Sequence, residues 1–224
     1  MLIMLQCQFK FYDDSDDRAA LSVRQRKIFS IDLIHGHMDP FFNECRAYGR
    51  LIEKNVNGKV AVHCYGYLMI PANREDELRN RFGVTTWNRP HEEYSKPASE
   101  RQPFRAIVKD LVTEDVPLTA KTAKKMLRDL RRMRRFEVYN MDIQARNYKG
   151  GRLVDFSVAM TTPHYLFVIK PAWRKEDYKY DDLRSFDHML DEAGVVTLDR
   201  ATPNPEFVSK LRPRDNKGRA TKQK

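Results

Sequence analysis

The sequence predicts an α+β fold, because short extended segments rich in β-branched and aromatic residues alternate with amphipathic helices. Three segments carry this prediction. Residues 40–52 and 119–136 have apolar side chains three and four positions apart, as in helices, and residues 60–70 have the composition of strands. A chain of 224 residues with 41% hydrophobic content can bury a sizeable core in one compact unit.

The first elements are a predicted strand and a predicted helix. Residues 2–12 are apolar and run into an acidic loop, which favours a strand close to the start of the chain. The helix that follows has Asp39 at the position of an N-cap and Pro40 at its first turn. Both residue types are favoured at those positions, so we expect a short amphipathic helix to begin there.

The middle of the chain predicts strands separated by an insertion. An Asn57-Gly58 turn precedes residues 60–70, which we expect to form one or two strands. Residues 73–103 are polar, hold Pro90 and Pro97 and lose their periodicity, so they are predicted to be an insertion or a long loop. Ala106-Ile107-Val108 then indicates a short buried strand.

A long basic helix is the clearest element of the second half. Thr119 has the side chain of an N-cap, and apolar residues recur at helical spacing up to Phe136, while eight Lys and Arg side chains occupy the remaining surface. Short extended segments at 138–143 and 152–156 follow. We expect Trp173, Phe186 and Met189 to supply core beyond them, and we expect the proline-containing basic tail, residues 201–224, to be disordered.

Composition limits the class of function. The chain has 41 basic and 31 acidic residues, a formal charge of +10, which favours anionic partners such as nucleic acid, phosphate or acidic protein surfaces. Three widely spaced cysteines indicate neither disulfides nor a zinc site, and His35 and His37 lack further ligands at metal-binding spacing. No apolar run is long enough to cross a bilayer, so we expect an intracellular protein without a membrane partner.

Three polar residues stand in an order that suits phosphoryl transfer. Such a reaction needs a carboxylate near the attacking hydroxyl, an oxygen ligand for one metal ion and a second carboxylate for the metal that bridges the phosphates. Asp142 is followed five residues later by Asn147 and thirteen residues later by Asp155, which begins Asp155-Phe156-Ser157. The alternative is that these side chains only cap turns and end a strand.

This spacing, downstream of the basic helix, predicts a protein-kinase-like bilobal fold with an incomplete N-lobe and a short C-lobe. Residues 1–112 would form the N-lobe, with the insertion at about 73–103, and residues 113–200 the C-lobe. Asp142 would be the catalytic residue, and Asn147 and Asp155 would hold magnesium.

Four longer segments resemble a known family. They are Pro40-Phe41-Phe42-Asn43-Glu44-Cys45-Arg46-Ala47-Tyr48-Gly49-Arg50-Leu51, Cys64-Tyr65-Gly66-Tyr67-Leu68, Arg105-Ala106-Ile107-Val108-Lys109 and Gly151-Arg152-Leu153-Val154-Asp155-Phe156-Ser157. Together they are similar to the fungal kinetochore Sim4-complex subunit family, a kinase-like group, over roughly residues 5–190. The resemblance implies a bilobal kinase-like fold and a kinetochore-associated role, with the nucleus as the corresponding compartment.

Several features depart from an active kinase. No glycine-rich loop is present to cradle a nucleotide, because the chain begins at what would be the third strand. Glu44 would be the helix carboxylate that pairs with the strand lysine, but Cys7 stands at the lysine position and leaves Lys10 as a poor substitute near ATP. Asn140-Met141 replaces the usual His-Arg pair. A longer native chain with a fuller N-lobe is one open explanation.

Three functions therefore compete. The preferred one is a degenerate, pseudokinase-type interaction module that binds a protein partner. The second is an atypical phosphotransferase that uses Mg and ATP. The third is a nucleic-acid-binding protein that uses the basic helix, residues 121–135, and the basic tail. The acceptor substrate, the identity of the partner and the oligomeric state are not determined by the sequence.

Overall fold

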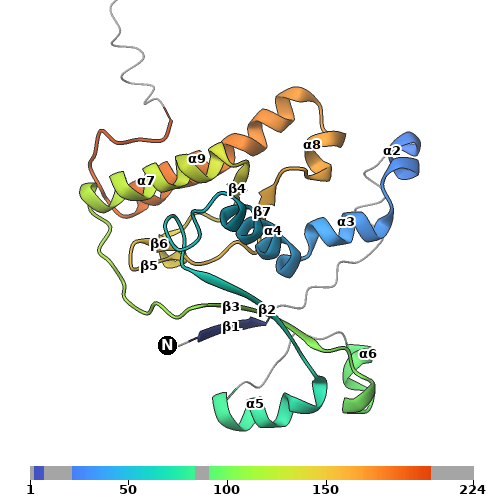
Figure 1. The fold of residues 1–224 in the computed structure, drawn as a ribbon. Helices are drawn as coiled ribbons and strands as arrows, with labels where there is room; N and C mark the ends of the chain where they lie inside the picture. Colours follow the sequence, from blue (N-terminus) through green and yellow to red (C-terminus); the bar gives the residue numbers. More distant parts are fainter. Residues whose placement is uncertain (1–2, 8–21, 84–90, 203–224) are drawn as a thin grey trace, which may run out of the picture.

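The computed structural model describes residues 3–7, 22–83 and 91–202 (Figure 1). Over these residues the fold is α+β with small antiparallel sheets, as predicted. The largest sheet has the strand order β1 (Ile3–Cys7), β3 (Phe104–Asp110), β2 (Cys64–Ile70), and both outer strands run antiparallel to β3. Strand β3 is therefore the central strand, and its residues 106–108 are buried as expected from their composition.

Three helices lie between β1 and β2 in the part of the chain that the structure describes. They are α2 (Val23–Ile28), α3 (Ile31–Met38) and α4 (Pro40–Glu53). The predicted start of α4 is confirmed: Pro40 is its first residue, and the Asp39 carboxylate accepts a hydrogen bond from the Phe41 N–H at 2.9 Å. The second Asp39 oxygen lies 2.7 Å from the Arg105 guanidinium on β3. One side chain thus caps the helix and anchors it to the sheet.

The polar segment that we expected to be an insertion or a long loop contains short helical elements. They are η1 (Ala72–Arg74), α5 (Glu75–Phe82), α6 (His91–Tyr94) and η2 (Ala98–Glu100). The buried Glu75 carboxylate lies 3.0 Å from the Arg101 guanidinium, so the two ends of the segment are joined by an ion pair. Figure 1 shows α5 and α6 beyond the sheet, on the side away from the long helices.

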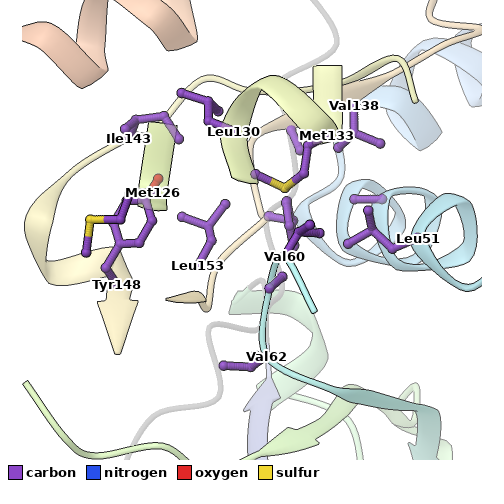
Figure 2. Packing of buried hydrophobic residues seen from close by; sticks show 14 of the residues in the cluster. Leu51, Val60, Val62, Met126, Leu130, Met133, Val138, Ile143, Tyr148 and Leu153 are labelled. Atoms are coloured by element: carbon purple, nitrogen blue, oxygen red, sulfur yellow. The ribbon is translucent and has the colours of Figure 1, made fainter. Parts of the chain in front are cut away.

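The main core forms where α7 (Ala120–Arg135) packs against α4 and the segment that precedes β2. Thr119 caps α7 as predicted, and it takes part in a capping box with Thr122. In Figure 2 the side chains of Met133, Leu51 and Val60 lie together, although they come from three different parts of the chain. The apolar residues predicted to form the inner face of α7, from Ala123 to Met133, are buried.

The remaining strands and helices complete this half of the molecule. They are β4 (Val138–Asn140), η3 (Ala145–Asn147), β5 (Tyr148–Lys149), β6 (Arg152–Leu153), β7 (Ala159–Thr161), α8 (Tyr165–Ile169) and α9 (Ala172–Glu192). Strand β4 pairs with β7, and β5 pairs with β6. The prediction for Phe186 and Met189 is confirmed, since both are buried in α9. The prediction for Trp173 is wrong, because it lies in the first turn of α9 and is 63% exposed.

Two predictions lie wholly or partly outside the described residues. The part of the N-terminal apolar segment after Cys7, including Lys10, is one, and the basic tail from residue 203 is the other. Within the described ranges, no helix combines the length and the apolar character needed to span a membrane.

Helices α3 and α8 meet through a pair of histidines. The rings of His37 and His164 have their centroids 4.7 Å apart, and His164 Nε2 lies 3.3 Å from the His37 carbonyl oxygen. Burial, with a smaller contribution from the Arg46 guanidinium in the same direction, lowers the pKa of each imidazole to about 4. Both rings are therefore neutral in the folded protein at pH 7.

Acidification should destabilise this contact. The unfolded chain binds protons at its histidines near pH 6.5, whereas the folded state does so only near pH 4, so stability is present above about pH 6.5 and falls as the pH drops toward 4. We expect the thermal unfolding midpoint to decrease between pH 7 and 5. His164→Gln should weaken this pH dependence, and the change His188→Gln at a side chain that is 73% exposed should leave it unaltered. Identical pH profiles for all three proteins would contradict the assignment.

Candidate functional site

The loop between β4 and β5 brings Asp142 and Asn147 into direct contact. The Asn147 side-chain nitrogen donates to the Asp142 carboxylate at 2.9 Å and to the Asp142 carbonyl oxygen at 3.0 Å. The other carboxylate oxygen of Asp142 accepts a hydrogen bond from the Gln144 side chain. Asn147 is buried, while the Asp142 side chain keeps about a quarter of its surface exposed (28%). The predicted catalytic residue is thus held by its own loop.

Asn140 connects this loop to the turn that contains Asp155. Its side-chain nitrogen donates to the Asp155 carbonyl oxygen at 2.9 Å, and its side-chain oxygen accepts from the Asp142 N–H at 3.3 Å. Asn140 is 1% exposed, so both bonds lie in the interior. A second link is the bond from the Val154 N–H to the Asn147 carbonyl oxygen, at 2.9 Å. The three predicted site residues therefore belong to one hydrogen-bonded unit.

The Asp155-Phe156-Ser157 turn is fixed from both sides. The Asp155 carboxylate accepts from the Ser157 N–H at 2.7 Å, and the Ser157 carbonyl oxygen accepts from the Asn43 side chain on α4 at 3.0 Å. Phe156 is fully buried, and its ring meets the Tyr48 ring edge-on with centroids 5.1 Å apart. Helix α4 is therefore the support on which this turn rests.

Glu44 and Lys109 form a buried ion pair at the same place. The Lys109 ammonium lies 2.9 Å from the Glu44 carboxylate, and the side chains are 0% and 2% exposed. Lys109 also donates to the Val154 carbonyl oxygen at 2.8 Å, and Glu44 accepts from the Phe156 N–H at 3.1 Å. We call Glu44, Lys109, Val154 and Phe156 the buried lysine cluster. It joins α4, β3 and the turn after β6.

The electrostatics of the cluster balance two opposing effects. Burial raises the pKa of the Glu44 carboxyl above its usual value, because the charged form loses its water. The Lys109 ammonium and the Phe156 N–H favour the charged form and oppose that rise. A buried carboxylate persists only with such partners, so the turn after β6 depends on both ends of the pair.

The sequence predicted the acidic member of this pair but not the basic one. Lys10, the expected partner of Glu44, lies outside the described residues. Lys109 takes part instead, from the end of the central strand. One signal was available: Lys109 lies two positions after Ile107, on the same face of a strand whose central residues, 106–108, are apolar. A charged side chain at such a position needs a buried partner.

The next feature of this region is the capacity of its side chains to bind a metal ion. Among the residues that the structure describes, no three His, Cys, Asp or Glu side chains converge in a way that could hold a metal. His35 and His37 have no third ligand in that set. Lys109 has no solvent-exposed surface, so in this conformation it cannot contact the phosphates of a nucleotide.

One comparison with known proteins gives a match. A family model described as kinetochore Sim4 complex subunit FTA2 matches residues 7–160, which is more than half of the chain and includes every residue of the site described above. No curated protein and no solved structure matches this sequence.

Removing one member of the buried ion pair should be more harmful than removing both. We expect Glu44→Gln and Lys109→Met each to lower the free energy of unfolding by about 3–5 kcal/mol, because each leaves a buried charge without its counter-ion. The double variant should lose clearly less than the sum of the two. Urea unfolding of the four proteins measures the coupling, and additivity within about 0.5 kcal/mol would show that the pair is not a unit.

The contribution of Asn140 to the free energy of unfolding should reflect the two polar groups to which its side chain is hydrogen-bonded. Asn140→Ala leaves the Asp155 carbonyl oxygen and the Asp142 N–H without this partner, and we expect a loss of about 1–3 kcal/mol. The control is Gln144→Ala, which removes an exposed side chain from the same loop and should cost less than about 0.5 kcal/mol. Equal effects of the two substitutions in urea unfolding would argue against the bridging role.

Proposed function

The chain belongs to the kinetochore Sim4 complex subunit FTA2 family, and we propose that it is a catalytically silent, kinase-like protein-binding subunit of a kinetochore complex. The family description implies protein partners and an intracellular, nuclear location. The finer part of the proposal, a pseudokinase-type module, is supported by the order of elements. Helix α4, which carries Glu44, precedes β2 and β3, and a basic helix precedes the Asp142 loop and the Asp155 turn.

The buried lysine cluster is the observation that carries the proposal. In an active kinase the lysine that pairs with the helix glutamate also contacts nucleotide phosphates, so it must reach the nucleotide. Lys109 is fully buried, and it donates to Glu44 and to the Val154 carbonyl oxygen. The same type of ion pair therefore serves here to hold α4 against the turn at Asp155. This structural role of the pair supports the interaction module.

A phosphotransferase that uses Mg and ATP is the alternative. Asp142, Asn147 and Asp155 are present and connected, but their polar groups bond to the protein itself. The Asp142 carboxylate accepts from Asn147 and Gln144, and the Asp155 carboxylate accepts from Ser157. These bonds stabilise the two loops. These internal bonds support a structural role for the three retained residues.

The test compares ligand binding with cellular location. The purified chain should show no change in its thermal unfolding midpoint when Mg and ATP are added, because nothing binds to the folded state. A stabilisation that disappears in Asp155→Ala, together with transfer of labelled phosphate, would instead establish the phosphotransferase.

The cellular arm tests the kinetochore role directly. A fluorescently tagged chain should co-localise with a kinetochore marker, and Asp142→Asn should co-localise equally well, since catalysis is not needed. Glu44→Gln is the matched variant that disturbs the structural cluster and should reduce the signal at the kinetochore. Diffuse distribution of the unaltered chain would contradict the kinetochore assignment. Loss of the kinetochore signal in Asp142→Asn alone would contradict catalytic silence.

A further inference from the structure

The outer face of α7 is covered by positive charge alone. Every residue from 121 to 135 that is exposed is a lysine or an arginine: Lys121, Lys124, Arg128, Arg131, Arg132 and Arg135. We call these six residues the α7 basic stripe. The helix contains a single carboxylate, Asp129, which is buried and lies 2.8 Å from the Lys125 ammonium.

The spacing of the stripe makes it a continuous surface. Its members are separated by one, three or four positions, so at 100° per residue they fall within one arc of the helix, opposite the buried residues. From Lys121 to Arg135 the stripe is about 21 Å long at 1.5 Å per residue. It is thus a straight row of cations on a rigid element.

Helix stability does not explain this arrangement. Arginines near the C-terminal end of a helix interact favourably with the helix dipole, but Lys121 and Lys124 lie in its first turns, where a cation is unfavourable. The pairs Lys124–Arg128 and Arg128–Arg132 place like charges four residues apart, which destabilises a helix. The stripe therefore opposes the stability of the element that carries it, as a binding surface often does.

Contacts among the described residues leave the charge largely uncompensated. Lys124 lies 3.7 Å from the Asp199 carboxylate, and Arg128 lies 3.8 Å from that of Asp129, both at long range and with exposed cations. Arg131 donates to the Arg200 carbonyl oxygen at 3.2 Å, a contact that carries no negative charge. Exposed pairs of this kind contribute little to stability.

We propose that the α7 basic stripe binds the phosphate backbone of B-form duplex DNA. The exposed positions include no apolar or aromatic side chain. Protein interfaces depend on such anchors at their centre, and single-stranded nucleic acid is held by aromatic stacking. A row of Arg and Lys side chains instead matches a row of phosphates, because guanidinium groups bind phosphate oxygens through two parallel hydrogen bonds.

The form of the duplex follows from the shape of the element. The major groove of B-DNA is about 12 Å wide and admits a helix between its two backbones, whereas the major groove of an RNA duplex is deep and narrow. Over 21 Å of its axis, duplex DNA carries about 12 phosphate charges, enough to engage all six cations. Binding through phosphates alone should not depend on base sequence. This inference is independent of whether the kinase-like core is catalytically silent.

The experiment uses the full chain and a labelled 20-base-pair DNA duplex of mixed sequence, with binding followed by fluorescence anisotropy from 50 to 200 mM NaCl. With six phosphate contacts, the logarithm of the association constant should fall against the logarithm of salt concentration with a slope of about −5. The variant Arg128→Gln/Arg132→Gln/Arg135→Gln should lower the steepness of this slope by about 3 and weaken binding at least tenfold at 100 mM NaCl.

The matched control removes the same number of charges elsewhere. Arg74→Gln/Arg79→Gln/Arg81→Gln changes exposed arginines on and next to α5, which Figure 1 shows on the far side of the sheet from α7. The basic tail is identical in both variants, so any difference between them reports on α7. The control should keep the original slope. Equal losses in the two variants would overturn the proposal, because net charge rather than the stripe would then be responsible.

Two further arms decide the partner and the integrity of the fold. A duplex RNA of the same sequence and polyglutamate should both bind more weakly than the DNA duplex, and tighter binding of either would overturn the assignment to DNA. The stripe variant should have a thermal unfolding midpoint equal to or above that of the original chain, because like-charge repulsion has been removed. No binding of the original chain to DNA at 50 mM NaCl would also overturn it.

Discussion

The structure depends on a lysine that has no access to water. Lys109 lies near the end of the central strand, inside the protein, where an uncompensated ammonium would cost many kcal/mol. Glu44 and the Val154 carbonyl oxygen must therefore be placed within reach of it. That requirement fixes three elements relative to one another: the strand that holds the lysine, helix α4 and the turn after β6. The Asp39 cap, which pairs with Arg105, fixes the N-terminus of the same helix to the opposite end of the same strand.

The polar loops derive their order from this core. The Phe156 N–H donates to Glu44, and the Phe156 ring packs against that of Tyr48. The Asn140 side chain then connects the Asp155 turn to the Asp142 loop. Asp142, Asn147 and Asp155 all take part in internal hydrogen bonds. The cations on the outer face of α7 differ from Lys109. They face solvent, and the ion pairs that Lys124 and Arg128 form with described carboxylates are longer and more exposed than the Glu44–Lys109 pair. The interior and the outer face of the chain thus indicate separate roles.

Local signals in the sequence were sufficient for some elements. The N-caps Asp39 and Thr119, with apolar residues at helical spacing after them, specify α4 and α7 because both cap and periodicity act within a few residues. Helix α9 lacked such a signal: its buried residues are confined to positions 182–190, and its first turns are exposed. For that reason Trp173 was wrongly assigned to the core. Lys109 could not be paired with Glu44, because 65 positions separate them and no local rule connects them.

The distance between partners along the chain also affects how the protein is made. The hydrogen bond from Phe156 to Glu44 spans 112 positions, so α4 must wait for its final contact until the turn after β6 has been synthesised. At about 5–20 residues per second, this interval on a ribosome is on the order of 10 s. During that time Glu44 and the apolar face of α4 have no complete core to enter. Nascent chains of this protein should therefore be clients of chaperones that shield hydrophobic helices until translation has passed residue 156.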